Sequence, residues 1–206
     1  MIELSYSEAH AILELQLGGY MTIRGEYQRE VYRRVDTFLT TNQKPKEFKI
    51  YLVAAMLLYF GRASDDAWLS MEDNGAMDQD TRLWLEAQQN AETAYIENLG
   101  NSLDEIRKAG NFDAKTIAAQ RADGYTKTLD RIYNNVKVSS AKDRMLTFGG
   151  HSGIESCVDC QNYLDQRHPA KWWRAMDAVP PNRNFECGGW KCEHYLHDDK
   201  GYLYTF

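Results

Sequence analysis

Four cysteines, all after residue 156 of a 206-residue chain, constrain its fold more than any other feature. They form a C-x2-C pair, Cys157-Val158-Asp159-Cys160, and a C-x4-C pair, Cys187-Gly188-Gly189-Trp190-Lys191-Cys192. Two such pairs supply four thiolates, the soft tetrahedral ligand set that Zn²⁺ prefers, and the glycines permit a sharp ligand turn. We therefore predict a structural zinc site formed by Cys157, Cys160, Cys187 and Cys192, with His194 as the alternative ligand.

The redox compartment decides between a metal and disulfide bonds. Residues 1–14 carry acidic side chains and no positively charged stretch, so we expect no signal peptide and synthesis in a reducing cytoplasm. That compartment favours metal binding, whereas two disulfides, reduced buried thiols and a redox-active C-x-x-C remain the alternatives. A site filled by four thiolates leaves no open position for water, so it would hold structure rather than perform chemistry.

Residues 1–147 carry apolar side chains at helical spacing and predict a helical bundle with long helices, hence a mainly α fold. Gly18 and Gly19 should end a short first helix, and Pro45 is a good first-turn residue. Gly110 should stop one helix and Asp113 should cap the next. The predicted helices cover about 5–17, 24–40, 45–60, 80–109 and 113–136.

Residues 148–206 predict a second domain, a small cysteine-rich module resembling a zinc knuckle. A glycine-rich break at 148–153 opens it, and a short helix is expected near 169–178. Alternation at 194–196 and 202–205, around a turn at 198–201, predicts a short β-hairpin.

Charge limits the partners of the chain. The net charge is −6, although residues 105–150 hold 9 Lys and Arg against 5 Asp and Glu. Because nucleic-acid affinity comes mainly from neutralised phosphates, this balance predicts at most a weak DNA contact through 105–150. A solvated helix face or a contact with an acidic partner explains the same stretch. The longest apolar run, 50–60, is too short to cross a membrane.

One class of enzyme, a zinc-braced nuclease, is a serious alternative for this chain. The chain has no Gly-rich phosphate loop, G-x-S-x-G elbow or H-E-x-x-H helix. Some nucleases of the HNH class use paired C-x-x-C knuckles to brace a metal site, and His168, Asn182 and Asn184 lie between or near the cysteine pairs. The D-H or H-H pair of that class is missing, so we take a zinc-braced nuclease as the alternative to a non-enzymatic protein.

The residues from Ile117 to Leu196 carry a more specific pattern. Arg121 and Tyr125 occur in a helix, followed by Ser156-Cys157-Val158-Asp159-Cys160-Gln161-Asn162-Tyr163-Leu164, then His168, Trp172-Trp173, Pro180-Pro181 and Glu186-Cys187-Gly188-Gly189-Trp190-Lys191-Cys192-Glu193-His194. This pattern resembles the C-terminal region of phage minor head proteins of the Mu F-like head-morphogenesis class. Relatives often carry a further cysteine at the position of His194, which leaves the fourth ligand open.

The resemblance implies a role for the whole chain. It would be a structural component of the head of a tailed phage or prophage, made in the host cytoplasm and carried in the virion near the portal. Its partners would be the portal or other head proteins, and its task assembly or DNA delivery. Self-association into a homo-oligomer, and a regulatory protein whose knuckle docks a partner, are further alternatives.

Overall fold

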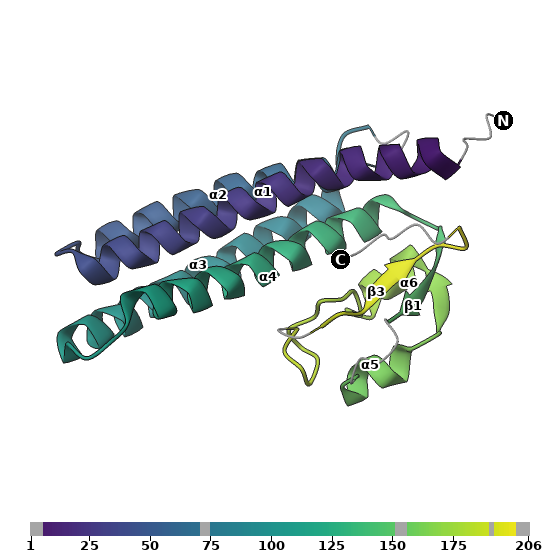
Figure 1. The fold of residues 1–206 in the computed structure, drawn as a ribbon. Helices are drawn as coiled ribbons and strands as arrows, with labels where there is room; N and C mark the ends of the chain where they lie inside the picture. Colours follow the sequence, from purple (N-terminus) through teal and green to yellow (C-terminus); the bar gives the residue numbers. More distant parts are fainter. Residues whose placement is uncertain (1–5, 71–74, 151–155, 190–191, 201–206) are drawn as a thin grey trace.

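Four long helices dominate the computed structural model, which describes residues 6–70, 75–150, 156–189 and 192–200, with the backbone alone for 6–18. They are α1 (Tyr6–Thr40), α2 (Pro45–Leu69), α3 (Gln79–Ala109) and α4 (Ala114–Ser140). The helices pack lengthwise on one another, and a smaller unit lies against α4 near its C-terminal end (Figure 1). The predicted mainly helical fold is confirmed.

Local sequence signals fix most helix ends. Pro45 is the first residue of α2, and the Asp78 carboxylate caps α3 by accepting from the Thr81 amide at 2.7 Å. Gly110 ends α3 with a φ of 74°, a left-handed conformation that favours glycine. Asp113 accepts from the amides of Lys115 and Thr116 at the start of α4. The predicted boundaries at Pro45, Gly110 and Asp113 are therefore confirmed.

The predicted break at Gly18-Gly19 is wrong, because α1 runs through it without interruption. Gly19 serves close packing instead. A Cβ atom at this position would lie 2.7 Å from Oδ1 of Asp66 on α2. The glycine lets the two helices approach, and the tertiary contact overrides its low helix propensity.

Helix α2 also differs from its predicted extent, since it continues nine residues past Phe60 to Leu69. Ala63, Ala67 and Trp68 extend its buried face by more than two turns. The helix is not buried all round, because Ile50 and Leu58 are each 57% exposed. This helix is apolar nearly all round in sequence, but one of its faces is exposed, so it does not lie at the centre of the bundle.

One hydrophobic core lies among the four long helices. Its largest fully buried side chains include Tyr20 and Tyr27 of α1, Phe48 and Phe60 of α2, and Tyr133 of α4. A buried polar contact accompanies the packing of α1 on α4. The Asp130 carboxylate accepts from the Tyr20 hydroxyl at 2.6 Å and from two nitrogens of Arg24 at 2.7 and 3.1 Å. Because the carboxylate is paired and hydrogen-bonded, its burial is tolerated.

Lys137, near the C-terminal end of α4, is only 6% exposed. Burial lowers the pKa of its ammonium group to about 8 from an ordinary 10.5, against the opposing charge of Asp66. Between pH 8 and 10.5 the unfolded chain therefore holds a proton that the folded chain has released. The contribution of Lys137 to stability therefore rises with pH across this window.

We expect the stability of the parent protein relative to a Lys137→Met variant to increase by about 1–2 kcal/mol between about pH 7.5 and 10. The variant lacks this contribution, because methionine carries no proton to release. Urea denaturation at several pH values measures both. Lys115→Met, at an exposed position of the same helix, should keep the rise. An equal pH dependence in Lys137→Met and the parent protein would contradict the assignment.

The smaller unit contains a three-stranded antiparallel sheet in the order β2-β1-β3. Its strands are β1 (Met145–Gly149), β2 (Arg167–Pro169) and β3 (Tyr195–His197), and its helices are α5 (Val158–Tyr163) and α6 (Ala170–Ala175). The first half of the predicted hairpin forms β3, which pairs with β1 through Phe148↔Leu196. The second half, 202–205, lies outside the described residues.

A second hydrophobic core fills this unit and begins before the predicted domain boundary at 147/148. It includes Val138 and Ala141 at the end of α4 and Leu146 and Phe148 of β1. Strand β1 spans this boundary, with residues on both sides of it. It lies at the centre of the sheet and pairs with β2 at one edge and β3 at the other. We therefore use the term C-terminal module for residues 141–200 as far as they are described.

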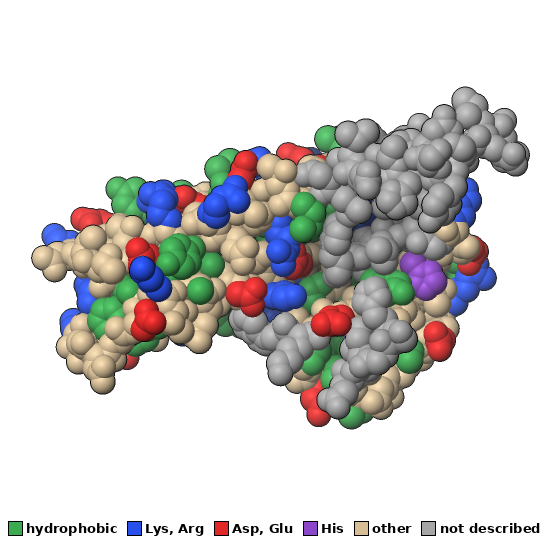
Figure 2. Space-filling view, viewed as in Figure 1, with side chains coloured by type: hydrophobic (Ala, Val, Ile, Leu, Met, Phe, Trp, Pro, Cys, Tyr) green, Lys and Arg blue, Asp and Glu red, His purple; other side chains and the backbone are tan. Residues whose placement is uncertain are grey.

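Hydrogen bonds fix the C-terminal module on the long helices. Asn134 Nδ2 donates to the Pro180 carbonyl at 2.8 Å, and Arg174 Nη1 donates to the Asn135 carbonyl at 2.9 Å. The Arg174 guanidinium also lies 4.6 Å above the Trp84 ring of α3. On the face shown in Figure 2, basic and acidic side chains are interspersed over the helices and module. In the described part of the chain, no helix has the length and apolar character needed to span a membrane.

Candidate metal centre

The four cysteines, which lie up to 35 positions apart in the sequence, come together in the C-terminal module. Sulfurs of Cys157, Cys160 and Cys187 all lie within 4.8 Å of one another. Cys160 also forms a second group, within the same distance, with the Cys192 sulfur and a ring nitrogen of His194. Thiolates bound to one tetrahedral zinc lie about 3.8 Å apart, given Zn–S bonds of about 2.3 Å. The cluster is therefore close to the size of a single metal site.

Each cysteine pair is positioned by a short local structure. Cys157 occupies the N-cap of α5 and Cys160 its first turn, so both sulfurs lie at the same end of that helix. Cys187 is followed by Gly188 and Gly189, whose φ angles of 60° and 74° are left-handed. A Cβ at Gly189 would lie 3.2 Å from the Asn182 carbonyl oxygen. These two glycines make the turn that the sequence predicts for the second pair.

Two acidic residues connect the halves of the cluster. The Asp159 carboxylate accepts from the Glu186 amide at 2.6 Å, and the Glu186 carboxylate accepts from the Val158 amide at 3.0 Å. This reciprocal pair holds the C-x2-C segment against the C-x4-C segment. Sequence reasoning missed both residues. In the sequence, each of these residues lies directly beside a cysteine. That position alone does not show which backbone amide the carboxylate will bind.

His194 is 3% exposed and lies at the edge of the cluster. Its Nδ1 is 3.9 Å from the Cys192 sulfur, and its Nε2 is 2.8 Å from the Ser156 hydroxyl. The ring stacks on Phe148 with centroids 5.5 Å apart. Gly150 makes room for this ring, since a Cβ there would lie 3.0 Å from His194 Cδ2. The histidine is thus fixed beside Cys192, with one ring nitrogen toward the sulfurs.

The four thiols have unequal acidities. A hydrogen bond with Cys160 lowers the pKa of Cys192 to about 6 despite burial, and His194 adds to the effect. The same bond, followed by burial, raises the pKa of Cys160. Burial acts against ionisation of Cys157, but backbone amides of Cys160 and Cys187 outweigh it and lower the Cys157 pKa. Burial raises the pKa of Cys187. Four adjacent thiolates repel one another, so a bound cation is needed for all four to ionise.

All four cysteines are free thiols. Cys160 and Cys192 are buried, whereas Cys157 and Cys187 are partly exposed. These Cys and His side chains are grouped so that they could hold a metal ion.

The residues considered for a nuclease lie in other contacts. The His168 ring stacks on Trp172 with centroids 3.7 Å apart, and its Nε2 lies 3.1 Å from Gln166 Oε1. Asn182 donates to the Asp177 carbonyl, and Asn184 Nδ2 donates to the Asp177 carboxylate at 2.7 Å. The two asparagines thus stabilise the 177–184 turn.

The module core meets the cluster through Trp173, whose side chain is fully buried. Its Nε1 lies 3.1 Å from the Leu146 carbonyl and 3.2 Å from the His168 carbonyl, so one indole N–H connects β1 with β2. Cys160 and Cys192 belong to the same core.

Comparison of the chain with protein-family models, curated proteins and solved structures finds no match.

Proposed function

We propose that this chain is a non-enzymatic interaction protein whose C-terminal module is closed by one structural zinc ion. The observation that carries the proposal is the convergence of four thiols and one imidazole within two overlapping groups. Cysteine sulfur and histidine nitrogen are the ligands of structural zinc sites. The long helices form a bundle that carries this zinc-knuckle-like module.

Cys157, Cys160, Cys187 and Cys192 are the ligands in this proposal. His194 acts beside them, with its Nδ1 toward the Cys192 sulfur and its Nε2 bound to Ser156. Hydrogen bonds of this kind orient a metal ligand and limit the charge on its sulfur. A fully protein-ligated zinc holds no water to activate, which supports a structural rather than a catalytic role.

Metal analysis of the purified protein tests the site. We expect one zinc per chain under reducing conditions, and a large loss of zinc affinity when Cys192 is replaced by serine. His194→Ala should keep the stoichiometry and bind about 10–100-fold more weakly, the usual cost of losing an outer partner. Zinc-free protein from zinc-supplemented, reduced preparations would refute the site. Retention by Cys192→Ser with loss in His194→Ala would make His194 the fourth ligand.

The biological role rests on the resemblance of residues 117–196 to phage minor head proteins. On that basis the chain is a portal-proximal component of a tailed-phage or prophage head, acting in head morphogenesis or DNA delivery. Co-purification with portal and capsid proteins encoded beside it tests this role. If the chain does not co-purify with either protein, and if it cleaves DNA in an assay in which His168→Ala does not, the zinc-braced nuclease is favoured instead.

The proposal includes a DNA contact of low affinity through residues 105–150. Several of the basic side chains in this stretch are engaged inside the protein. Arg131 pairs with buried Glu92, Lys137 is 6% exposed, and Arg107 donates to three backbone carbonyls. Fewer cations are left to neutralise phosphates, so any duplex binding should be weak and fall steeply with salt.

A further inference from the structure

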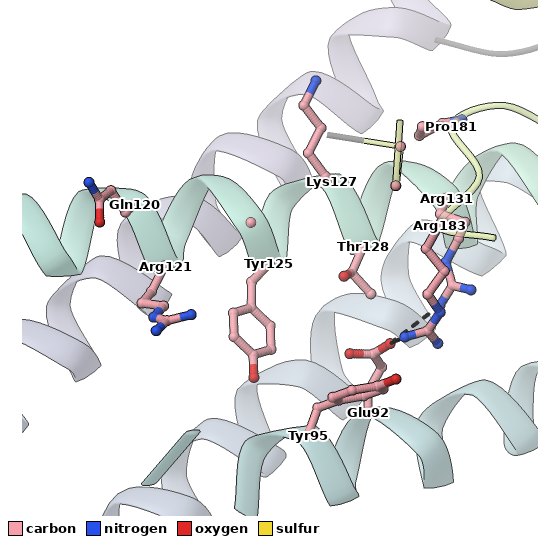
Figure 3. Close-up of a pocket in the computed structure, with 13 residues that line it drawn as sticks. Glu92, Tyr95, Gln120, Arg121, Tyr125, Lys127, Thr128, Arg131, Pro181 and Arg183 are labelled. Atoms are coloured by element: carbon pink, nitrogen blue, oxygen red, sulfur yellow. Dashed lines mark hydrogen bonds and ion pairs between the residues drawn. The ribbon is translucent and has the colours of Figure 1, made fainter. Parts of the chain in front are cut away.

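A cavity of about 300 Å³ lies where α3, α4 and the C-terminal module meet, and Gly188 and Gly189 of the C-x4-C turn line one side of it. Figure 3 shows Tyr95 and Glu92 on α3, with Tyr125 and Arg121 extending from α4 toward them and Lys127 extending the other way. Gly124 and Thr128 also line the cavity. At 100° per residue, these two positions fall between Tyr125 and Lys127 around the α4 axis. The cavity therefore has a floor on α4 and walls of different chemistry.

One end of the cavity has more positive than negative charge. Arg131 Nη2 and Arg183 Nη1 lie 3.3 and 3.0 Å from the same oxygen, Oε1 of Glu92. The Glu92 side chain is 4% exposed, so a single buried carboxylate faces two guanidinium groups. Burial and then the charge of Arg183 lower the pKa of Arg131 to about 10, although Glu92 and, more weakly, Asp177 oppose this. An anion at this end would be attracted by the uncompensated charge.

Two further cations line the same cavity. Arg121 and Lys127 have no hydrogen bond or ion pair with any residue in the described part of the chain. Lys127 lies one helical turn from Arg131, although its side chain extends away from Glu92, the partner of Arg131 (Figure 3). Arg121 lies about 9 Å from Lys127 along the helix axis. Four cations and one carboxylate thus line a single cavity in a chain whose net charge is −6.

An aromatic side chain separates the two cationic ends. Tyr125 is half-buried, and its ring stacks on no other ring among the described residues. Guanidinium groups bind phosphate through paired hydrogen bonds, and tyrosine rings stack on planar bases. A volume near 300 Å³ is at the lower end of those of small-molecule sites.

We propose that this cavity binds a small phosphate-bearing molecule with a planar ring, of the mononucleotide class. The phosphate lies at the end formed by Arg131 and Arg183, with Lys127 supplying a further positive charge from the α4 side. The ring lies against Tyr125, with its polar edge toward Arg121. None of the four cysteines lines this cavity, so a failure of the zinc-loaded protein to bind the ligand leaves the proposed function untouched.

Titration calorimetry of the full chain with AMP tests the site. We expect saturable 1:1 binding, with inorganic phosphate and adenosine each binding more weakly. Arg121→Gln combined with Lys127→Gln should weaken AMP binding by about tenfold or more, since each substitution removes a charged contact. Tyr125→Leu should remove the preference for AMP over phosphate, whereas Tyr125→Phe should keep it.

The control is Arg29→Gln combined with Lys115→Gln, which removes the same charge at two exposed positions outside the cavity. It should bind AMP as the parent protein does. No saturation at about 10 mM AMP, equal weakening in the control, or phosphate binding as tight as AMP would each overturn the proposal. Binding of an oligo(dT) strand without binding of AMP would also overturn it, in favour of single-stranded DNA.

Discussion

Removal of the metal by a strong chelator should unfold the C-terminal module while the four long helices stay folded. Cys160 and Cys192 belong to the core of the module, whereas the core of the long helices contains no cysteine among its described residues. Structural zinc supplies about 10 kcal/mol or more of folding free energy in small domains. A module of about sixty residues with a small apolar core has little stability to replace it.

Hydrogen exchange followed by mass spectrometry measures this result segment by segment. Peptides from β1, α5 and β3 should lose protection after chelation, and peptides from α2 and α3 should keep it. Cys160→Ser should reproduce the effect without chelator. Ser156→Ala is the matched control, because it removes a hydroxyl beside the cluster but leaves all four thiols. Unchanged protection in the module, or equal loss in α2 and α3, would contradict the prediction.

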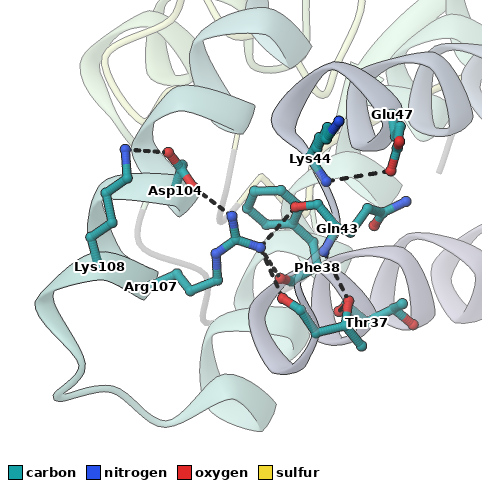
Figure 4. Close-up of polar contacts among 9 residues, drawn as sticks. Thr37, Phe38, Gln43, Lys44, Glu47, Asp104, Arg107 and Lys108 are labelled. Atoms are coloured by element: carbon teal, nitrogen blue, oxygen red, sulfur yellow. Dashed lines mark hydrogen bonds and ion pairs between the residues drawn. The ribbon is translucent and has the colours of Figure 1, made fainter.

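Replacing Arg107 with alanine should lower the free energy of unfolding by about 3 kcal/mol. Its Nη1 donates to the carbonyls of Phe38, Thr41 and Gln43 at 3.1, 2.9 and 2.8 Å, where α1 ends (Figure 4). The last carbonyls of a helix have no intrahelical partner, so the bond to Phe38 satisfies such a group, and the bonds to Thr41 and Gln43 hold the turn that follows α1. The guanidinium also lies 4.4 Å above the Phe38 ring. Hydrogen bonds to charged groups contribute about 1.5–3 kcal/mol each, net of the bonds to water that they replace, and here the two N–H groups of Nη1 are shared among three carbonyls.

Urea denaturation followed by circular dichroism gives the loss directly. Arg107→Lys should recover only part of the stability, because an ammonium group lacks the planar fork that reaches several carbonyls. Lys108→Ala is the control, since Lys108 binds the same Asp104 carboxylate but its side chain is 73% exposed. Its effect should be small, as for other surface ion pairs. A loss in Arg107→Ala no larger than in Lys108→Ala would contradict the structural role.

Short-range signals explain which parts of the fold were predictable. Pro45, Gly110 and Asp113 act on the backbone within one turn, and the structure places helix ends at each. Gly18-Gly19 carries the same local signal as Gly110, yet α1 continues through it. The difference lies in Asp66, a residue 47 positions away that packs against Gly19. No local pattern contains that contact.

The strand pairing was unpredictable for a similar reason. The alternation at 194–196 indicates a strand, but its partner depends on which edge is available in space. Here β1 supplies it, with Phe148 pairing to Leu196 across 48 positions, and β2 takes the other edge of β1. Short strands gain stability only from such neighbours.

Spacing and residue type alone determined that this chain has four thiols in two pairs, suited to one soft metal, after a long helical region. Only the tertiary structure decided that Asp159 and Glu186 connect the pairs and that His194 lies beside Cys192. It also decided that Glu92 pairs with both Arg131 and Arg183 at one end of a cavity. The physical reason is range. Ligand turns and helix caps form within a few residues, whereas charges and rings meet only after distant segments have packed.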